Sequence, residues 1–307
     1  GSAIVEVELG EGAAMRRLVF SGDLGQPGRP VLRDATPVAH ADLLVVESTY
    51  GNRLHRPLDA TLDELVVALE RTLKGARGNV VIPSFAVGRT QELLFVLTRL
   101  TREGRLHGLN VHVDSPMALA ATEVTLRHPE LLDGEAHELM AWQKGHPKDP
   151  RIHFVQDVEE SMALNTVRGG AIVISASGMC EAGRIKYHLL HNLPRPECAI
   201  VIVGFQAAGT LGRRLVDGAR RVTLFGKSVQ VRATIHTIGG LSAHADQAAL
   251  LGWLRGFRHP PRQTFVVHGE LETAQYFAGK IRDDLGWTRV DVPAQGDQAN
   301  IETRNME

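Results

Sequence analysis

Short runs of β-branched and apolar residues alternate along the chain with segments that are apolar at helical spacing. The leucines at 62, 65, 69 and 73, and those at 93, 94, 97 and 100, follow helical periodicity and are interpreted as core. The runs typical of strands are Arg17–Phe20, Leu43–Glu47, Asn79–Pro83, Asn110–Asp114, Arg151–Val155, Ala171–Ser175, Ala199–Phe205, Val222–Phe225, Val229–Ile238 and Thr264–His268. This alternation predicts an α/β fold with a mostly parallel sheet.

Two segments interrupt this rhythm. The run "RVTLFGKSVQVRATIHTIGG" places two strands next to each other, split by Gly226-Lys227, and the polar loop "GNRLHRPLD" covers residues 51–59. We interpret both as boundaries, and two such boundaries suggest that one domain is inserted into another. The predicted segments are 1–54, 55–231 and 232–307.

Composition narrows the functional classes. The chain has 307 residues, is 43% hydrophobic and has a formal net charge of −1, so a nucleic-acid substrate would need a local basic cleft. Two cysteines make no disulfide framework and suit a reducing cytoplasm. No apolar run has membrane-spanning length, so we expect a cytoplasmic protein without a membrane partner. The fourteen histidines point to metal binding or acid–base chemistry.

Four acidic or histidine residues share one context, in which an apolar segment ends and a glycine or small residue lies close by. They are Asp23 in "RRLVFSGDLG", Glu47 in "DLLVVESTYG", His244 in "IGGLSAHAD" and His268 in "QTFVVHGE". Ligands of open α/β sheets bind beyond the carboxyl ends of the strands, so these side chains could meet in one cleft. Aspartate with histidine suits zinc, and a carboxylate beside a histidine suits acid–base work.

Simpler interpretations of the same residues stay open. Asp23 and Asp246 could cap a turn or a helix start, and His268 alone could be an interior histidine. Glu47 at the end of a buried strand is harder to explain in this way, because an unpaired buried carboxylate is costly. The repetition of one context favours a joint site.

A second group of candidates could bind an anion. "SASGM" follows a buried strand and precedes a helix, so Ser177, Gly178 and Arg184 are predicted to hold a substrate phosphate, or else to form an ordinary capping loop. "GFQAAGTLGRR" adds Gln206, Gly209 and Thr210, which we expect to line the cleft. The pair at 188 and 191 has a spacing that could bind metal, but "YHLLHNL" favours a packed helix.

Seven ordered motifs carry a resemblance to a known family. "FSGDLG", "VVESTYGN", "PSFAVGRTQELL", "DSPMA", "SASGMCEAGRIKYHL", "GLSAHAD" and "VHGE" together resemble the β-CASP branch of the metallo-β-lactamase superfamily, which contains RNA-processing nucleases. The resemblance covers essentially the whole chain. It implies a partial αββα lactamase layer in segments 1–54 and 232–307, with an inserted β-CASP α/β domain in 55–231.

The resemblance also implies roles. Asp23 matches the aspartate that bridges two zinc ions, and His268 matches a ligand of the second zinc. Glu47 and His244 match the acidic residue and the histidine of two β-CASP motifs. In the family this histidine is not a metal ligand but is thought to protonate the leaving oxygen of the scissile phosphate, and Glu47 would hold it charged and oriented.

One departure from the family pattern matters. Relatives carry an HxHxDH ligand motif and a further histidine ahead of the bridging aspartate, and neither occurs in this sequence. Five of the seven metal ligands that the resemblance implies are therefore absent. We expect a family member that lacks the first half of its lactamase domain and is inactive as this chain.

The sequence thus predicts a zinc-dependent ribonuclease that hydrolyses phosphodiester bonds with two zinc ions and a histidine general acid. RNA is favoured over DNA because the DNA-repair members lack a histidine at the position of His268. The alternative is a non-catalytic RNA-binding or scaffold subunit, against which the intact motif residues argue. A nucleotide-cofactor module is disfavoured because no GxGxxG follows an early strand. The mode of cleavage, the RNA target and the oligomeric state stay open.

Overall fold

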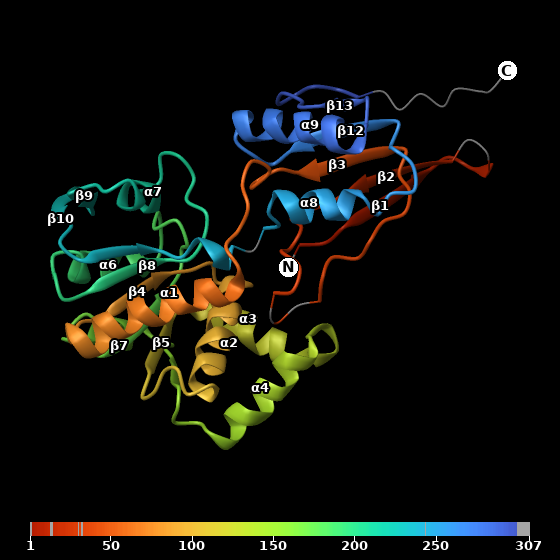
Figure 1. Cartoon of the computed structure of the whole chain (residues 1–307). Coiled ribbons are helices and arrows are strands. Elements are labelled where there is room, and N and C mark those ends of the chain that lie inside the picture. Colours follow the sequence, from red (N-terminus) through yellow and green to blue (C-terminus); the bar gives the residue numbers. More distant parts are fainter. Residues whose placement is uncertain (1, 13–14, 30, 32, 243, 300–307) are drawn as a thin grey trace. The chain divides into compact units, whose positions relative to one another are not determined.

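The chain forms two compact units in the computed structural model, which describes residues 2–12, 15–29, 31, 33–242 and 244–299 (Figure 1). Unit 1 consists of Gly1–Arg29, Asp34–His55 and Ala243–Glu307. Unit 2 consists of Pro30–Arg33 and Arg56–Ser242. Unit 1 is therefore assembled from chain segments that flank unit 2 on both sides. Strands and helices alternate in both units, which confirms the predicted α/β class.

Unit 1 is a five-stranded sheet with two helices. The strands follow the order β1 (Val5–Leu9), β2 (Arg16–Phe20), β3 (Leu43–Glu47), β12 (Gln263–Val267) and β13 (Val290–Asp291). β1 is antiparallel to β2, and the other pairs are parallel. Helices α8 (Gln247–Leu254) and α9 (Leu271–Leu285) bury their apolar residues, Phe277 among them, in one core with Leu44, Val46 and Val266 of the strands. Burial of these side chains gives unit 1 its own hydrophobic core.

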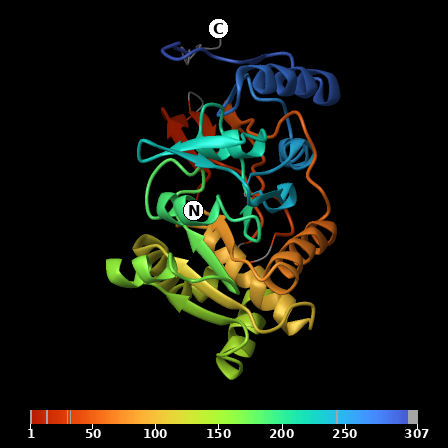
Figure 2. The ribbon, with the colours of Figure 1, turned by 90° about the vertical axis from the view of Figure 1, so that its left-hand side faces the viewer.

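Unit 2 is built on a six-stranded, fully parallel sheet, seen from another side in Figure 2. Its order is β11 (Thr234–Thr237), β8 (Ala199–Ile202), β4 (Val80–Pro83), β7 (Ala171–Ser175), β5 (Asn110–Asp114) and β6 (Arg151–Phe154). The helices are α1 (Leu58–Glu70), α2 (Arg89–Arg102), α3 (Pro116–Arg127), α4 (Gly134–Gly145), α5 (Val158–Leu164), α6 (Ile185–Asn192) and α7 (Leu211–Val216).

Helices cover both faces of this sheet, as the strand sequences require. Side chains of a strand alternate between faces, and β4 is apolar at every position. Val80 and Ile82 pack in one core with α1 and α2, whereas Val81 packs in another with α6 and α7. The first leucine pattern lies in α1 and the π-helical turn Arg71–Gly75 that follows it, the second lies in α2, and most of those leucines are buried.

The region after residue 220 differs from the prediction. The hairpin around Gly226 is present as β9 (Arg221–Leu224) and β10 (Lys227–Gln230). The single strand expected over 229–238 is wrong, because Arg232 and Ala233 both donate their N–H groups to the carbonyl of Leu193 and divide it into β10 and β11. Since β11 pairs with β8, the two compact units are divided at 242/243, and the domain boundary expected at 231/232 stays a prediction.

The structure contains a strand, β1, that the sequence did not indicate, and its helices can be compared with the length and apolarity of a membrane span. β1 is an edge strand whose residues are mostly exposed, and Glu6 and Glu8 pair with Arg17 across it. Among the described residues, none of the helices combines the length and apolarity needed to cross a bilayer.

Candidate active site

The strand register of unit 1 gathers three of the predicted residues at one edge of the sheet. Phe20 of β2 pairs with Val45 of β3, and Glu47 of β3 pairs with Val267 of β12. Because these strands are parallel, the loops that leave them start at the same edge. His268 follows β12 directly and Asp23 lies in the short loop after β2, so strand order places two carboxylates and a histidine at the same edge.

Glu47 is buried and binds through both carboxylate oxygens. Its side chain is 1% exposed; Oε1 accepts the N–H of Leu24 at 2.6 Å, and Oε2 lies 2.9 Å from Nδ1 of His244. The backbone N–H of Glu47 in turn donates to Oγ of Ser21. The carboxylate is thus fixed from two sides, and it orients the imidazole of His244, whose side chain is 21% exposed.

The turn around His244 is held by the neighbouring loops of unit 1. His244 bridges to Gly25, and the N–H of Ala245 donates to the carbonyl of Leu24 at 2.7 Å. Asp246 caps helix α8 through Ala249 N, as one interpretation of the sequence held, and its second oxygen accepts the N–H of His55 at 2.9 Å. This support was not apparent from the sequence, since His55 and Asp246 are 191 residues apart.

Asp23 and His268 form a more exposed pair next to His244. Oδ1 of Asp23 lies 3.3 Å from Nδ1 of His268, and the His244 and His268 rings are 5.6 Å apart. His268 adopts a φ of 53°, which is uncommon for a residue other than glycine. The hydroxyl of Thr49 donates to its carbonyl at 3.0 Å and so supports this backbone. A strained backbone next to convergent polar groups is typical of a functional site.

The same three side chains could hold a metal ion. One ligand atom from each of Asp23, His244 and His268 lies within 4.8 Å of the others, and this is the one such group found among the described residues. Carboxylate oxygen and imidazole nitrogen suit zinc. Nδ1 of His244 contacts Glu47, so Nε2 is the ring atom of His244 that is left to meet a metal ion or a substrate. Capping of a helix by Asp23, one alternative from the sequence, is not observed.

The predicted phosphate-binding residues lie in unit 2, in the loop between β7 and α6. Oγ of Ser177 accepts a hydrogen bond from the N–H of Ala182, and the N–H of Ser177 donates to the carbonyl of Ala182. Ser177 therefore closes the loop. Gly178 is buried under the ring of Phe85. Arg184 ends the loop and is 22% exposed. The structure therefore brings these three residues into one short loop of unit 2.

A buried aspartate that the sequence analysis did not single out anchors this arginine. Asp114 ends β5 with its side chain fully buried; Oδ1 accepts from Nη1 of Arg184 at 2.7 Å, and Oδ2 from Nε2 of His188 and Oγ of Ser161 at 2.6 Å. Burial alone would raise the pKa of Asp114, but the hydrogen bonds from these three groups outweigh it and lower the pKa. His188 is thus a packed helix residue, as the sequence favoured.

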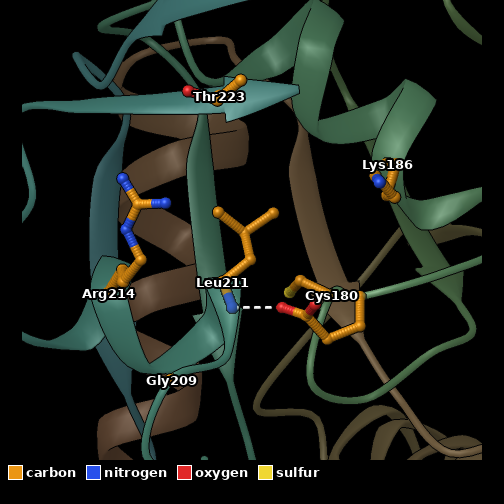
Figure 3. A pocket seen from close by; sticks show the side chains of 7 residues that line it. Cys180, Lys186, Gly209, Leu211, Arg214 and Thr223 are labelled. Atoms are coloured by element: carbon orange, nitrogen blue, oxygen red, sulfur yellow. Dashed lines mark hydrogen bonds between the residues drawn. The ribbon is translucent and has the colours of Figure 1, made fainter. Parts of the chain in front are cut away.

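The remaining predicted residues have structural contacts. Gln206 is buried and donates to the carbonyls of Gly178 and Gly204, while Thr210 caps α7 by accepting the N–H of Arg213. Gly209 lines a cavity of about 150 Å³ in unit 2 (Figure 3), together with Cys180, Glu181, Lys186, Leu211, Arg214 and Thr223. Burial raises the pKa of Cys180 to about 12, so this thiol stays protonated and unreactive.

Comparison with known proteins agrees with this architecture. The family model described as Beta-Casp domain matches residues 90–215, within unit 2, and the one described as Zn-dependent metallo-hydrolase RNA specificity domain matches residues 228–293. The chain is 42% identical over 275 residues to a ribonuclease of Thermus thermophilus, covering 89% of this chain and 61% of that protein.

Two archaeal relatives are more distant. A transcription termination factor FttA of Pyrococcus abyssi is 31% identical over 295 residues, covering 93% of this chain and 45% of the factor. An RNase J-like protein of Methanocaldococcus jannaschii is 29% identical over 300 residues, covering 95% of this chain and 65% of that protein. The chain thus spans about half to two thirds of the length of these relatives.

The chain thus joins an acidic and histidine cluster at the edge of one α/β sheet to a second α/β unit that matches the Beta-Casp model. The chain belongs to the β-CASP family of metallo-β-lactamase proteins.

Proposed function

We propose that the chain is part of a zinc-dependent ribonuclease, with unit 1 carrying the chemistry. This proposal rests on the hydrogen-bonded pair of Glu47 and His244, which lies beside Asp23 and His268. The relatives' names, a ribonuclease and an RNase J-like protein, support RNA as the substrate. A family model named for zinc dependence and RNA specificity supports both the metal and the substrate class.

Asp23 and His268 are the residues that would hold zinc in this chain. When bound, zinc polarises phosphoryl oxygen atoms and activates water. Two or three ligands make a weak site, because a stable zinc site takes four donors. We therefore propose that two ions and full activity require further ligands, which a form of the protein as long as its relatives would supply.

His244 is the proposed general acid. Its Nδ1 is oriented by Glu47 at 2.9 Å, which makes Nε2 the atom through which it would donate a proton to the leaving oxygen of RNA. Glu47 itself is buried and already binds two partners, so its role is to position the imidazole. A histidine held in this way keeps one orientation without a further loss of side-chain entropy during the reaction.

The test separates metal binding from proton transfer in the form of the protein that spans the length of its relatives. We expect His268→Ala to lose both bound zinc and RNA cleavage. We expect His244→Ala and Glu47→Gln to keep their zinc and to lose about 10²–10⁴-fold in cleavage rate, the usual share of general acid catalysis. Zinc content and rate are measured on the same samples.

Two controls sharpen the result. His40, an exposed histidine in unit 1, should tolerate alanine in both assays. A substrate with a better leaving group should partly restore His244→Ala, because protonation of the leaving oxygen then matters less. Loss of zinc from His244→Ala would show that it is a metal ligand. Wild-type protein that binds RNA but does not cleave it with zinc present would favour the non-catalytic RNA-binding subunit.

A further inference from the structure

The carboxyl edge of the sheet in unit 2 carries an exposed aromatic ring. Pro83 of β4, Ser175 of β7 and Asp114 of β5 are paired side by side in the parallel register. The residues that follow them therefore leave the sheet at one edge. Phe85 lies there two residues after β4, and it is 48% exposed although phenylalanine is more often buried.

The ring of Phe85 is supported by the neighbouring loop. A Cβ atom at Gly178 would lie 3.0 Å from two carbon atoms of this ring, so the ring packs directly on the glycine. The carbonyl of Phe85 accepts hydrogen bonds from both N and Oγ1 of Thr90, which fixes its backbone at the start of α2. Part of the ring thus packs against the backbone of Gly178, and the backbone of Phe85 is held by Thr90.

The loop that supports Phe85 also ends in a fixed guanidinium. Arg184 donates through Nη1 to Asp114, and within the described part of the chain no other acceptor contacts this guanidinium. Asp114 is fully buried, and Ser161 and His188 occupy its second oxygen. This arrangement leaves the outer donors of Arg184 for a ligand, and a planar guanidinium suits phosphate.

Phe85 packs on Gly178 of this loop and Arg184 ends it, so an exposed aromatic ring and an anchored arginine both adjoin one loop, and this pair of side chains suits an RNA strand. Unpaired RNA bases stack on aromatic side chains, and their phosphates bind arginine. We propose that this edge of unit 2 binds an unpaired RNA strand, with Phe85 stacking on a base and Arg184 donating to a phosphate. The subsite rests on the proposed RNA substrate and adds to it residues of unit 2 that bind the strand.

Binding is measured by fluorescence anisotropy on the whole 307-residue chain in EDTA, so that no cleavage contributes. The probes are a labelled oligoadenylate of about ten nucleotides and an abasic ribose–phosphate strand of equal length. We expect Phe85→Ala to weaken oligoadenylate binding roughly ten- to hundredfold and to leave abasic binding unchanged. Phe85→Trp should retain the affinity. Phe225→Ala is the matched control, since Phe225 is 45% exposed in the same unit.

Arg184 is tested through the salt dependence of binding. We expect Arg184→Gln to weaken both probes and to lower the slope of log affinity against log salt by about 0.7, the value for one phosphate contact on a single strand. Arg102→Gln, at the far end of α2, is the control. If Arg184→Gln does not fold because Asp114 loses its partner, Arg184→Lys replaces it as the test, because lysine keeps the charge. Arg184→Lys should bind both probes more weakly and should keep the wild-type slope of log affinity against log salt.

The outcomes are distinct. Unchanged oligoadenylate binding by Phe85→Ala, or an equal loss with the abasic strand, overturns the stacking role. An unchanged salt slope in Arg184→Gln overturns the phosphate contact. In both cases wild-type binding to RNA leaves the proposed function standing, whereas a wild-type chain that binds neither probe overturns the RNA substrate and the subsite together.

Discussion

Glu47 and Asp114 are buried carboxylates at the ends of parallel strands, and each orients a basic side chain. Glu47 holds the imidazole of His244, and Asp114 holds the guanidinium of Arg184. A buried charge is tolerated when its partners satisfy it, and removing one partner is costly. In both units, therefore, the residue that could meet a substrate is positioned by one that is inaccessible to it.

Asp114 gives a prediction about acid stability. Its pKa is lowered in the folded protein, so its contribution is fully present above the unfolded value of 3.8 and is lost as the pH falls through the lower folded value. We expect Asp114→Asn to cost about 3–5 kcal/mol at pH 7. The difference in unfolding free energy between wild type and Asp114→Asn should shrink below pH 3.8, measured by urea unfolding at several pH values.

Asp133, which caps α4 through Ala136 N, provides a comparison at the surface of unit 2. Asp133→Asn should cost much less at pH 7, since asparagine is also a good helix cap. A difference between Asp114→Asn and wild type that stays constant from pH 7 to below pH 3.8 would contradict the role of the ionised Asp114.

The sequence could predict some of these residues and not others. Asp23, Glu47 and His268 each lie at or just beyond the end of a recognisable strand, so the rule for parallel sheets was sufficient to bring them together. Asp114 also ends such a strand, but its partners Ser161 and His188 are 47 and 74 residues away and lie on helices. Side-chain pairing between distant helices has no periodic signal in the sequence.

At the scale of elements, α9 and the turn after β3 pack at very short range. A Cβ atom at Gly51 would lie 2.6 Å from Cβ of Phe277, a fully buried residue of α9. We expect Gly51→Ala to push α9 from the sheet and to destabilise unit 1 by about 1–3 kcal/mol, as overpacking usually does. Urea unfolding followed by tryptophan fluorescence measures the change.

Gly279 is the matched control on the same helix. No atom lies within 4 Å of a Cβ atom built there, so Gly279→Ala should stabilise α9 by up to about 1 kcal/mol through helix propensity. Opposite signs for the two glycine substitutions are the expected result. Equal or neutral effects would show that the contact of Gly51 with Phe277 can relax.

Element prediction was accurate where one periodicity dominated. The apolar runs of β4 and β7 and the leucine spacing of α2 identify buried strands and a buried helix face. The segment 229–238 was misassigned because its β-branched residues continue through Arg232, where bonds to Leu193 divide it. Hydrogen bonds to a distant carbonyl override the local strand propensity, and the neighbouring residues give no sequence signal for them.

At the scale of the whole molecule, the two units have separate cores and separate tryptophans. Trp253 and Trp287 belong to unit 1, and Trp142 belongs to unit 2. We expect zinc to raise the melting temperature of unit 1 while leaving that of unit 2 unchanged, because Asp23 and His268 both lie in unit 1. At a zinc concentration 100-fold above its Kd, the stabilisation would be about 2.7 kcal/mol.

Trp142→Phe leaves fluorescence from unit 1 alone and so reports the unit that contains the proposed ligands. In this background, zinc should shift the transition, and EDTA or His268→Ala should remove the shift. A zinc-dependent shift that survives His268→Ala and Asp23→Asn would place the metal elsewhere. This measurement needs no catalytic activity.

The division of unit 1 into segments on both sides of unit 2 has a consequence during synthesis. Glu47 pairs with Val267, so about 220 further residues are synthesised after β3 before its neighbour β12 leaves the ribosome. At about 5–20 residues per second that delay is roughly 10 to 45 seconds, during which unit 2 can fold from a nearly continuous stretch. The nascent chain therefore carries an unpaired apolar strand edge throughout this interval, when chaperones and not the sheet itself must protect it.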